Sequence, residues 1–169
     1  MAAKLAISIH IRIRDRPNAC GSANRTPTQR ETIIEQTSIA LIGRYYAAFN
    51  AGDMTAFVSL VADGVVHDIN EGKREVGRTA FAAFMTRMNA SYAERLTDIV
   101  VMATADGTRA AAEFVVHGAY LKSDLGLPEA RGQSYVLPAG AFFEIRDGAI
   151  ARITNYYSLA QWVAQVGGA

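Results

Sequence analysis

The sequence predicts one α+β domain over residues 28–169, with helices first and long antiparallel strands after them. Two observations predict this class. Apolar residues in the first half recur at helical spacing, whereas the second half holds long β-prone segments joined by short turns that contain Asp-Gly. A block of helices followed by a block of strands favours α+β over an alternating βαβ sheet. A chain of 169 residues is long enough to bury both a core and a pocket.

The first two helices are predicted from their capping residues. Thr28 and Glu31 have the spacing of a capping box, so the first helix is predicted to begin there. It is predicted to end at Gly52, since glycine readily adopts the left-handed C-cap conformation. Asp53 is predicted to cap a second helix that continues through Leu60.

A short strand and a third helix are predicted next. Asp63-Gly64 predicts a turn, and the apolar residues around His67 predict a strand over residues 65–69. Thr79 predicts the N-cap of the third helix. Its apolar side is assigned to the core and is formed by Phe81, Phe84, Met85 and Met88.

Two hairpins and a closing helix complete the predicted domain. Residues 96–103 and 109–121 flank one Asp-Gly turn, and residues 134–145 and 149–157 flank a second. A long loop over residues 123–132 joins the hairpins, and a short helix is predicted over residues 159–166. No repeat or low-complexity tract interrupts this order.

Residues 1–27 are predicted to be an extension outside the domain. Residues 5–13 alternate between apolar and polar as a half-buried strand does, but residues 16–27 are mostly small, polar or helix-breaking. A flexible extension, an added strand and an arginine-rich targeting segment all remain open. The single cysteine, Cys20, excludes an intrachain disulfide and a zinc site built from several cysteines.

Charge and motifs exclude several classes of partner and cofactor. The net charge is +1, but residues 1–30 hold six basic and one acidic residue, which leaves a mildly acidic body and argues against nucleic acid. No apolar run is long enough to span a membrane and no secretory leader is evident, so we expect a cytoplasmic protein. Phosphate-binding glycine loops are missing, and Glu113 and His117 would lie about 13 Å apart along a strand. We therefore expect neither a cofactor nor a metal.

Four segments, taken in order, resemble the SnoaL-like branch of the nuclear transport factor 2-like superfamily, and within it the ketosteroid isomerase-related proteins. They are residues 44–53 (RYYAAFNAGD), 62–68 (ADGVVHD), 76–78 (VGR) and 153–157 (ITNYY). The resemblance covers about residues 30–166. It implies a cone-shaped roll, in which a curved antiparallel sheet wraps around the N-terminal helices and encloses a pocket. It implies a fold more strongly than a reaction, since the superfamily contains isomerases, cyclases, dehydratases, epoxide hydrolases and binding domains.

The resemblance also implies catalytic residues. Asp68 matches the general base of ketosteroid isomerase, and Tyr45 matches its oxyanion tyrosine. The second oxyanion donor of that enzyme aligns with Ala141, which has no donor. His117, or alternatively Asn155, is expected to polarise the ligand oxygen.

An ungapped alignment of the first hairpin, and the resemblance for the later strands, imply which other residues face the pocket. They are Glu113, Val115, Tyr135, Ala141, Phe143, Asn155 and Tyr157. Several of these are polar, so the pocket is expected to be more polar than a steroid site. His67 is expected to point away from the face of Asp68 and to have a structural or interface role.

These implications lead to one functional hypothesis and two alternatives. The first is a cofactor-free isomerase, cyclase or lyase that transfers a proton on a small apolar or partly polar organic molecule with a carbonyl group. A non-catalytic ligand-binding or dimerisation module of the same fold is the alternative. Epoxide hydrolysis would need an Asp-Arg-Asp arrangement, which the expected pocket positions do not supply. Apolar residues on the outer face, such as Phe142 and Tyr156, predict a homodimer.

Overall fold

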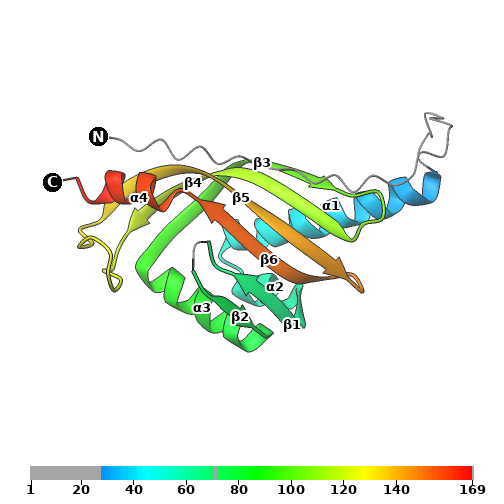
Figure 1. Cartoon of the computed structure of the whole chain (residues 1–169), viewed down its shortest axis with the longest axis horizontal. Coiled ribbons are helices and arrows are strands. Elements are labelled where there is room, and N and C mark those ends of the chain that lie inside the picture. Colours follow the sequence, from blue (N-terminus) through cyan, green and yellow to red (C-terminus); the bar gives the residue numbers. More distant parts are fainter. Residues whose placement is uncertain (1–27, 71, 169) are drawn as a thin grey trace, which may run out of the picture.

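A computed structural model describes residues 28–70 and 72–168, and it confirms the α+β class (Figure 1). The predicted strand over residues 5–13 and Cys20 lie outside the described residues. The elements, in chain order, are α1 (Gln29–Ala51), α2 (Met54–Ser59), β1 (Val61–Asp68), β2 (Arg74–Val76), α3 (Arg78–Ser91), β3 (Tyr92–Ala103), β4 (Arg109–Tyr120), β5 (Gln133–Arg146), β6 (Ala149–Tyr157) and α4 (Leu159–Val166).

The strands form one curved six-stranded sheet with the order β2-β1-β6-β5-β4-β3. Neighbouring strands are antiparallel except β1 and β6, which are parallel. The expectation of a wholly antiparallel sheet is therefore wrong at this pair. The reason is topological: all of the chain from β2 to β5 lies between β1 and β6, and so long a connection allows parallel pairing.

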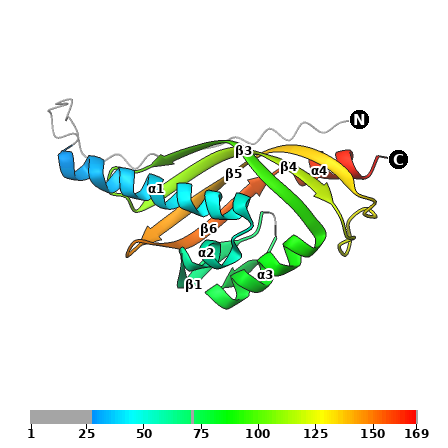
Figure 2. The same cartoon turned by 180° about the vertical axis from the view of Figure 1, so that it is seen from behind.

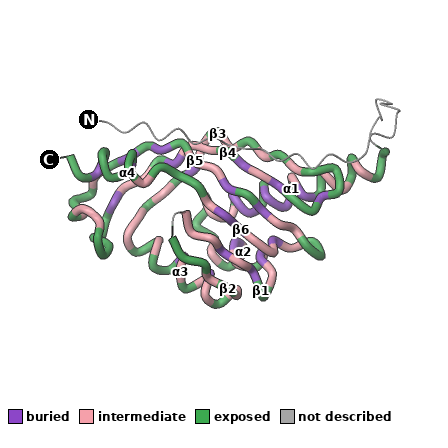
Figure 3. The backbone as a smooth tube through the Cα atoms, in the orientation of Figure 1, coloured by how far each residue is buried: buried purple, intermediate pink, exposed green. Residues whose placement is uncertain are grey.

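The helices α1, α2 and α3 lie on the concave side of the sheet, and α1 runs across it (Figure 2). Their apolar sides pack on the inward-facing residues of the strands and form one core, so buried positions concentrate where helices and sheet meet (Figure 3). Aromatic side chains dominate this contact. Tyr45 stacks on Phe57 with ring centroids 4.2 Å apart, and Phe57 stacks on Phe81 at 5.7 Å.

The capping residues of the first two helices behave as the sequence predicts. The backbone N–H of Thr28 donates to the Glu31 carboxylate at 2.7 Å, and the Thr28 hydroxyl accepts from the N–H of Glu31. Gly52 ends α1 with a φ of 70°, in the left-handed region. The Asp53 carboxylate accepts from the N–H of Ala56 at 2.9 Å and caps α2.

Two local predictions are corrected by tertiary structure, and one short strand is added. Asp63-Gly64 lies inside β1, because β1 begins at Val61 and continues through a register irregularity instead of a turn. The N-cap of α3 is Gly77, with a φ of 101° that other residues rarely adopt, so Thr79 lies within the helix. The three-residue strand β2 is too short to produce an alternating pattern and was not predicted. None of the helices in the described ranges is long and apolar enough to cross a membrane.

Candidate functional site

A cavity of about 600 Å³ lies between the helices and the concave face of the sheet. Its walls are mostly aromatic and apolar, and α4 contributes Trp162 at one end. Such a cavity suits a small organic molecule, because apolar walls supply binding energy and a few polar groups fix its orientation. The polar side chains on the walls, apart from tyrosines, are Asn50, His67, Asn70, Asn89, Glu94, Asp124 and Asn155.

His67 is the most deeply buried of these polar residues. It is 1% exposed and packs edge-on against Phe81 and Phe84, with centroids 5.2 and 4.8 Å away. Its Nε2 lies 3.2 Å from the amide nitrogen of Asn155, whereas its Nδ1 is buried without a hydrogen-bond partner in the described structure. Burial lowers the pKa of His67, so the imidazole is neutral at pH 7.

Glu75 lies beside His67 on the neighbouring strand, as its register partner in β2. Its Oε1 accepts from the guanidinium of Arg87 at 3.1 Å, but its Oε2 is buried and has no hydrogen-bond partner in the described structure. The charge of Glu75 raises the pKa of His67 and partly offsets the effect of burial. A carboxylate beside an imidazole stabilises the imidazolium that forms when the imidazole accepts a proton.

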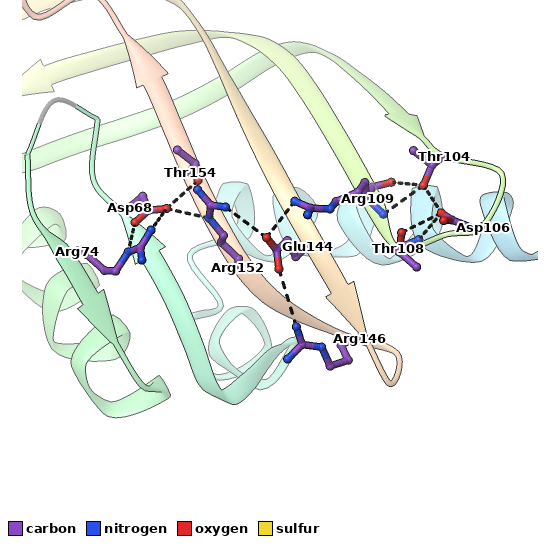
Figure 4. A network of polar contacts seen from close by, with 10 residues as sticks. All are labelled: Asp68, Arg74, Thr104, Asp106, Thr108, Arg109, Glu144, Arg146, Arg152 and Thr154. Carbon is purple, nitrogen blue, oxygen red and sulfur yellow. Dashed lines mark hydrogen bonds and ion pairs between the residues drawn. The ribbon is translucent and has the colours of Figure 1, made fainter. Parts of the chain in front are cut away.

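Asp68 faces the opposite way and does not line the cavity. Its carboxylate is held on the convex side by Arg74 at 2.6 Å and by Arg152 at 2.8 Å (Figure 4). Thr154 donates a further hydrogen bond at 3.2 Å. These hydrogen bonds, with that of Arg74 the strongest, lower the pKa of Asp68 to about 2. The expectation that Asp68 faces the pocket and His67 faces away is therefore reversed, since neighbouring residues of a strand point to opposite faces.

The same inversion affects β4. The cavity is lined by Phe114 and Val116, whereas Glu113, Val115 and His117 belong to the convex face. The imidazole of His117 is exposed, and its Nε2 lies 3.1 Å from the Thr97 hydroxyl. The expected inward set is wrong here because a shift of one residue in the alignment moves every side chain to the other face.

The remaining expected residues divide into two groups. Tyr45, Tyr135, Asn155 and Tyr157 line the cavity, as the alignment implies. Ala141 and Phe143 point inward but are buried in the core rather than at the cavity wall. Burial raises the pKa of Tyr45, and the nearby Tyr46 adds to that effect, so its hydroxyl stays protonated and can act only as a neutral donor or acceptor.

Glu94 and Tyr46 also line the cavity and were not expected from the sequence. Oε1 of Glu94 accepts from the Tyr135 hydroxyl at 2.5 Å. The Tyr46 hydroxyl is buried without a hydrogen-bond partner in the described structure. Glu94 was missed because β3 begins at Tyr92, four residues before the predicted strand. In residues 28–70 and 72–168, no group of three or more His, Cys, Asp or Glu side chains is placed to hold a metal ion.

One family model and several solved structures are similar to this chain. The family model of the SnoaL-like domain matches residues 42–153. Among solved structures, a candidate polyketide cyclase from Pseudomonas putida is 64% identical, with a TM-score of 0.76 over 76% of this chain and 97% of that chain. A second candidate polyketide cyclase, from Xanthomonas campestris, is 56% identical, with a TM-score of 0.76 over 78% of this chain and 98% of that chain.

A more distant structure shares the fold alone. It is an LEH-like epoxide hydrolase from Mycobacterium tuberculosis, which is 16% identical, with a TM-score of 0.63 over 78% of this chain and 86% of that chain. A search of curated proteins found no match.

Proposed function

Because the chain belongs to the SnoaL-like domain family, we propose that its cavity binds a small carbonyl-bearing molecule and that His67 transfers a proton on it without a cofactor. The proposed reaction class is isomerisation or ring closure. The identity to two candidate polyketide cyclases supports this class.

In the proposed reaction, the ligand displaces the Asn155 amide from Nε2 of neutral His67, and Nε2 removes a proton from a carbon next to the ligand carbonyl. The C–H electron pair moves into the carbonyl group and gives an enolate. In a β,γ-unsaturated ligand the enolate is conjugated with the C=C bond and takes the proton back from the imidazolium at the γ-carbon. In a ligand with a second carbonyl, the enolate carbon attacks that carbonyl and closes a ring, and the resulting alkoxide takes the proton from the imidazolium. Asn155, whose amide nitrogen lies beside His67, is placed to donate to the developing oxygen anion.

The observation that carries the proposal is the environment of His67. Proton transfer near pH 7 requires a base that is neutral before the reaction and whose charged form is stabilised after it. His67 is kept neutral by burial, and the carboxylate of Glu75 lies beside it. Asp68, in contrast, is already committed to two arginines and faces away from the cavity.

A non-catalytic ligand-binding module is the second candidate, and the 1% exposure of His67 favours it. A base that a ligand cannot reach is a structural residue. The two candidates differ in a single property, which is whether a bound molecule exchanges protons with the protein.

The test uses hydrogen–deuterium exchange. Purified protein is incubated in D2O with cyclic enones, steroid enones and aromatic diketones, and deuterium uptake next to the carbonyl is followed by NMR. We expect protein-dependent uptake for at least one compound, and we expect His67→Gln to reduce it at least ~100-fold. Binding without uptake across the panel would assign the protein to the binding-module class.

We also propose that two copies of the chain pack through the convex face. Phe142 and Tyr156 are 59% and 53% exposed there and contact each other edge-on at 5.8 Å. A two-fold related copy would cover this apolar surface. Sedimentation velocity should give a dimer that Phe142→Glu dissociates, whereas a monomeric wild type at micromolar concentration would contradict the proposal. A cytoplasmic location remains an expectation from the sequence.

A further inference from the structure

A second polar group of the cavity spans three neighbouring strands. Glu94 of β3, Gly118 of β4 and Tyr135 of β5 are register partners in one row across the sheet. Glu94 and Tyr135 both line the cavity. The Tyr135 hydroxyl donates to Oε1 of Glu94, although β4 lies between their strands. The tyrosine ring must therefore cross β4 at Gly118.

Gly118 makes this crossing possible. A Cβ atom at residue 118 would lie 2.1 Å from Cζ of Tyr135, which is inside van der Waals contact. Trp162 of α4 packs edge-on against the same ring, with centroids 5.9 Å apart. The ring is thus confined from two sides, and its hydroxyl holds the Glu94 carboxyl in one position.

One oxygen of the Glu94 carboxyl is available to accept a hydrogen bond from a ligand. The hydrogen bond from Tyr135 uses Oε1, and Glu94 takes part in no ion pair within the described ranges, so Oε2 is left to accept from a bound molecule. Burial raises the pKa of Glu94, which the hydrogen bond from Tyr135 partly opposes. A half-buried carboxyl held by one neutral partner differs from the doubly ion-paired Asp68.

The cavity offers no counter-charge to an anionic ligand. Among its described lining residues there are two carboxyl side chains, Glu94 and Asp124, and neither lysine nor arginine. A carboxylate or phosphate on a bound molecule would lose its hydration without gaining a cation. A hydroxyl or amide N–H near Glu94 would instead gain a hydrogen bond to an acidic group, which is stronger than a bond between neutral groups.

We propose that Glu94, positioned by Tyr135 across Gly118, is a ligand-binding residue that accepts a hydrogen bond from a hydroxyl or N–H donor and selects uncharged ligands over anions. This inference rests on the proposed function only in taking the cavity as the ligand site. It assigns to that site a ligand that carries a donor in addition to its carbonyl group.

Binding of three matched probes to the full chain tests the proposal. They are 2-naphthol, which is uncharged and has a donor, 2-methoxynaphthalene, which has none, and 2-naphthoate, which is an anion. Trp162 is the single tryptophan of the chain and lines the cavity, so its fluorescence reports binding there, with calorimetry as a second readout. We expect 2-naphthol to bind at least about tenfold more tightly than each of the other two.

Substitutions identify the residue responsible. Glu94→Gln replaces the carboxyl by an amide with little change in shape. It should reduce the ratio of the affinity for 2-naphthol to that for 2-naphthoate at least about threefold. Glu113→Gln makes the same change at an exposed glutamate on the convex face of β4 and should leave the preference unchanged. Tyr135→Phe keeps the ring over Gly118 but releases the carboxyl, so it should also narrow the preference and gives a second test if Glu94→Gln does not fold.

The proposal is overturned if 2-naphthol does not bind, if the anion binds as tightly as 2-naphthol, or if Glu94→Gln and Tyr135→Phe change folding stability but not the preference. It is also overturned if Glu113→Gln has the same effect as Glu94→Gln. These outcomes are separate from those of the proposed function. Failure of deuterium exchange with the binding order intact would reject proton transfer alone, whereas the reverse result would reject the role of Glu94 alone.

Discussion

Ionisable side chains have opposite environments on the two faces of the sheet, and the adjacent residues His67 and Asp68 show the difference most clearly. On the concave face, burial lowers the pKa of His67 and, against the hydrogen bond from Tyr135, raises the pKa of Glu94. On the convex face, two arginines favour the charged form of Asp68. A satisfied ion pair stabilises a fold, whereas incompletely satisfied buried groups at a cavity are expected where a ligand completes them.

Other ionisable side chains on the convex face are ion-paired, as Asp68 is. Arg152 contacts both Asp68 and Glu144, and Glu144 also contacts Arg109, so one ion-pair network follows β1, β6, β5 and β4 (Figure 4). Each carboxylate in it has at least two cationic or hydroxyl partners. Both carboxylates of this network are held by arginines of the chain itself, so we interpret it as structural.

The largest expected effect tests the concave face through Gly118→Ala. The new Cβ would collide with the ring of Tyr135, so the free energy of unfolding should fall by ~2–3 kcal/mol and Glu94 should lose its partner. Urea unfolding measures the change. The matched control is Gly43→Ala in α1, where no atom lies within 4 Å of the new Cβ and where helix propensity predicts a gain of ~0.5–1 kcal/mol. Equal effects of the two substitutions would contradict the packing described for Tyr135.

A smaller effect is expected from Glu75→Gln, which removes the carboxylate beside His67. Because the charge of Glu75 raises the pKa of His67, its loss should shift the acid limb of the rate profile to lower pH and slow exchange about tenfold at pH 7. The affinity of the cavity for 2-naphthol should stay the same. Rates of deuterium exchange between pH 4 and 8 measure the position of the acid limb and the rate at pH 7, and an unshifted acid limb would exclude an electrostatic role for Glu75.

The smallest effect concerns the convex face through Asp68→Asn. The folded pKa of Asp68, about 2, lies below its ordinary value of 3.8, so its contribution to stability is present above pH 4 and is lost as the pH falls toward 2. Solvent screening at this partly exposed group limits the contribution to ~0.5–1 kcal/mol. The difference in unfolding free energy between wild type and Asp68→Asn should therefore shrink from pH 7 to pH 2. A constant difference would show that the ion pairs do not titrate as described.

The features that could be predicted from the sequence are those that local residues determine. The capping box at Thr28, the C-cap at Gly52 and the two Asp-Gly hairpins depend on neighbouring residues, and each is present in the structure. The parallel pairing of β1 with β6 depends on contacts between distant segments, and no local pattern specifies it.

The candidate site was harder to predict than the fold, because strand alternation has a period of two residues and does not say which set faces inward. The match of Asp68 to the family's base and the ungapped alignment of the first hairpin thus placed Asp68, Glu113 and His117 in the pocket instead of His67, Phe114 and Val116. No local sequence pattern marks Glu94 as a residue of the pocket. Its importance becomes visible only when Gly118 and Tyr135 are seen in the same row.

The most direct test of the account compares His67→Gln with Asp68→Asn in one exchange assay, using the carbonyl compound that wild type labels fastest. The account predicts that His67→Gln lowers deuterium uptake at least ~100-fold with probe affinity nearly unchanged, and that Asp68→Asn lowers stability but leaves uptake within about twofold. The opposite result, with uptake lost in Asp68→Asn and retained in His67→Gln, would contradict the assignment of the two faces.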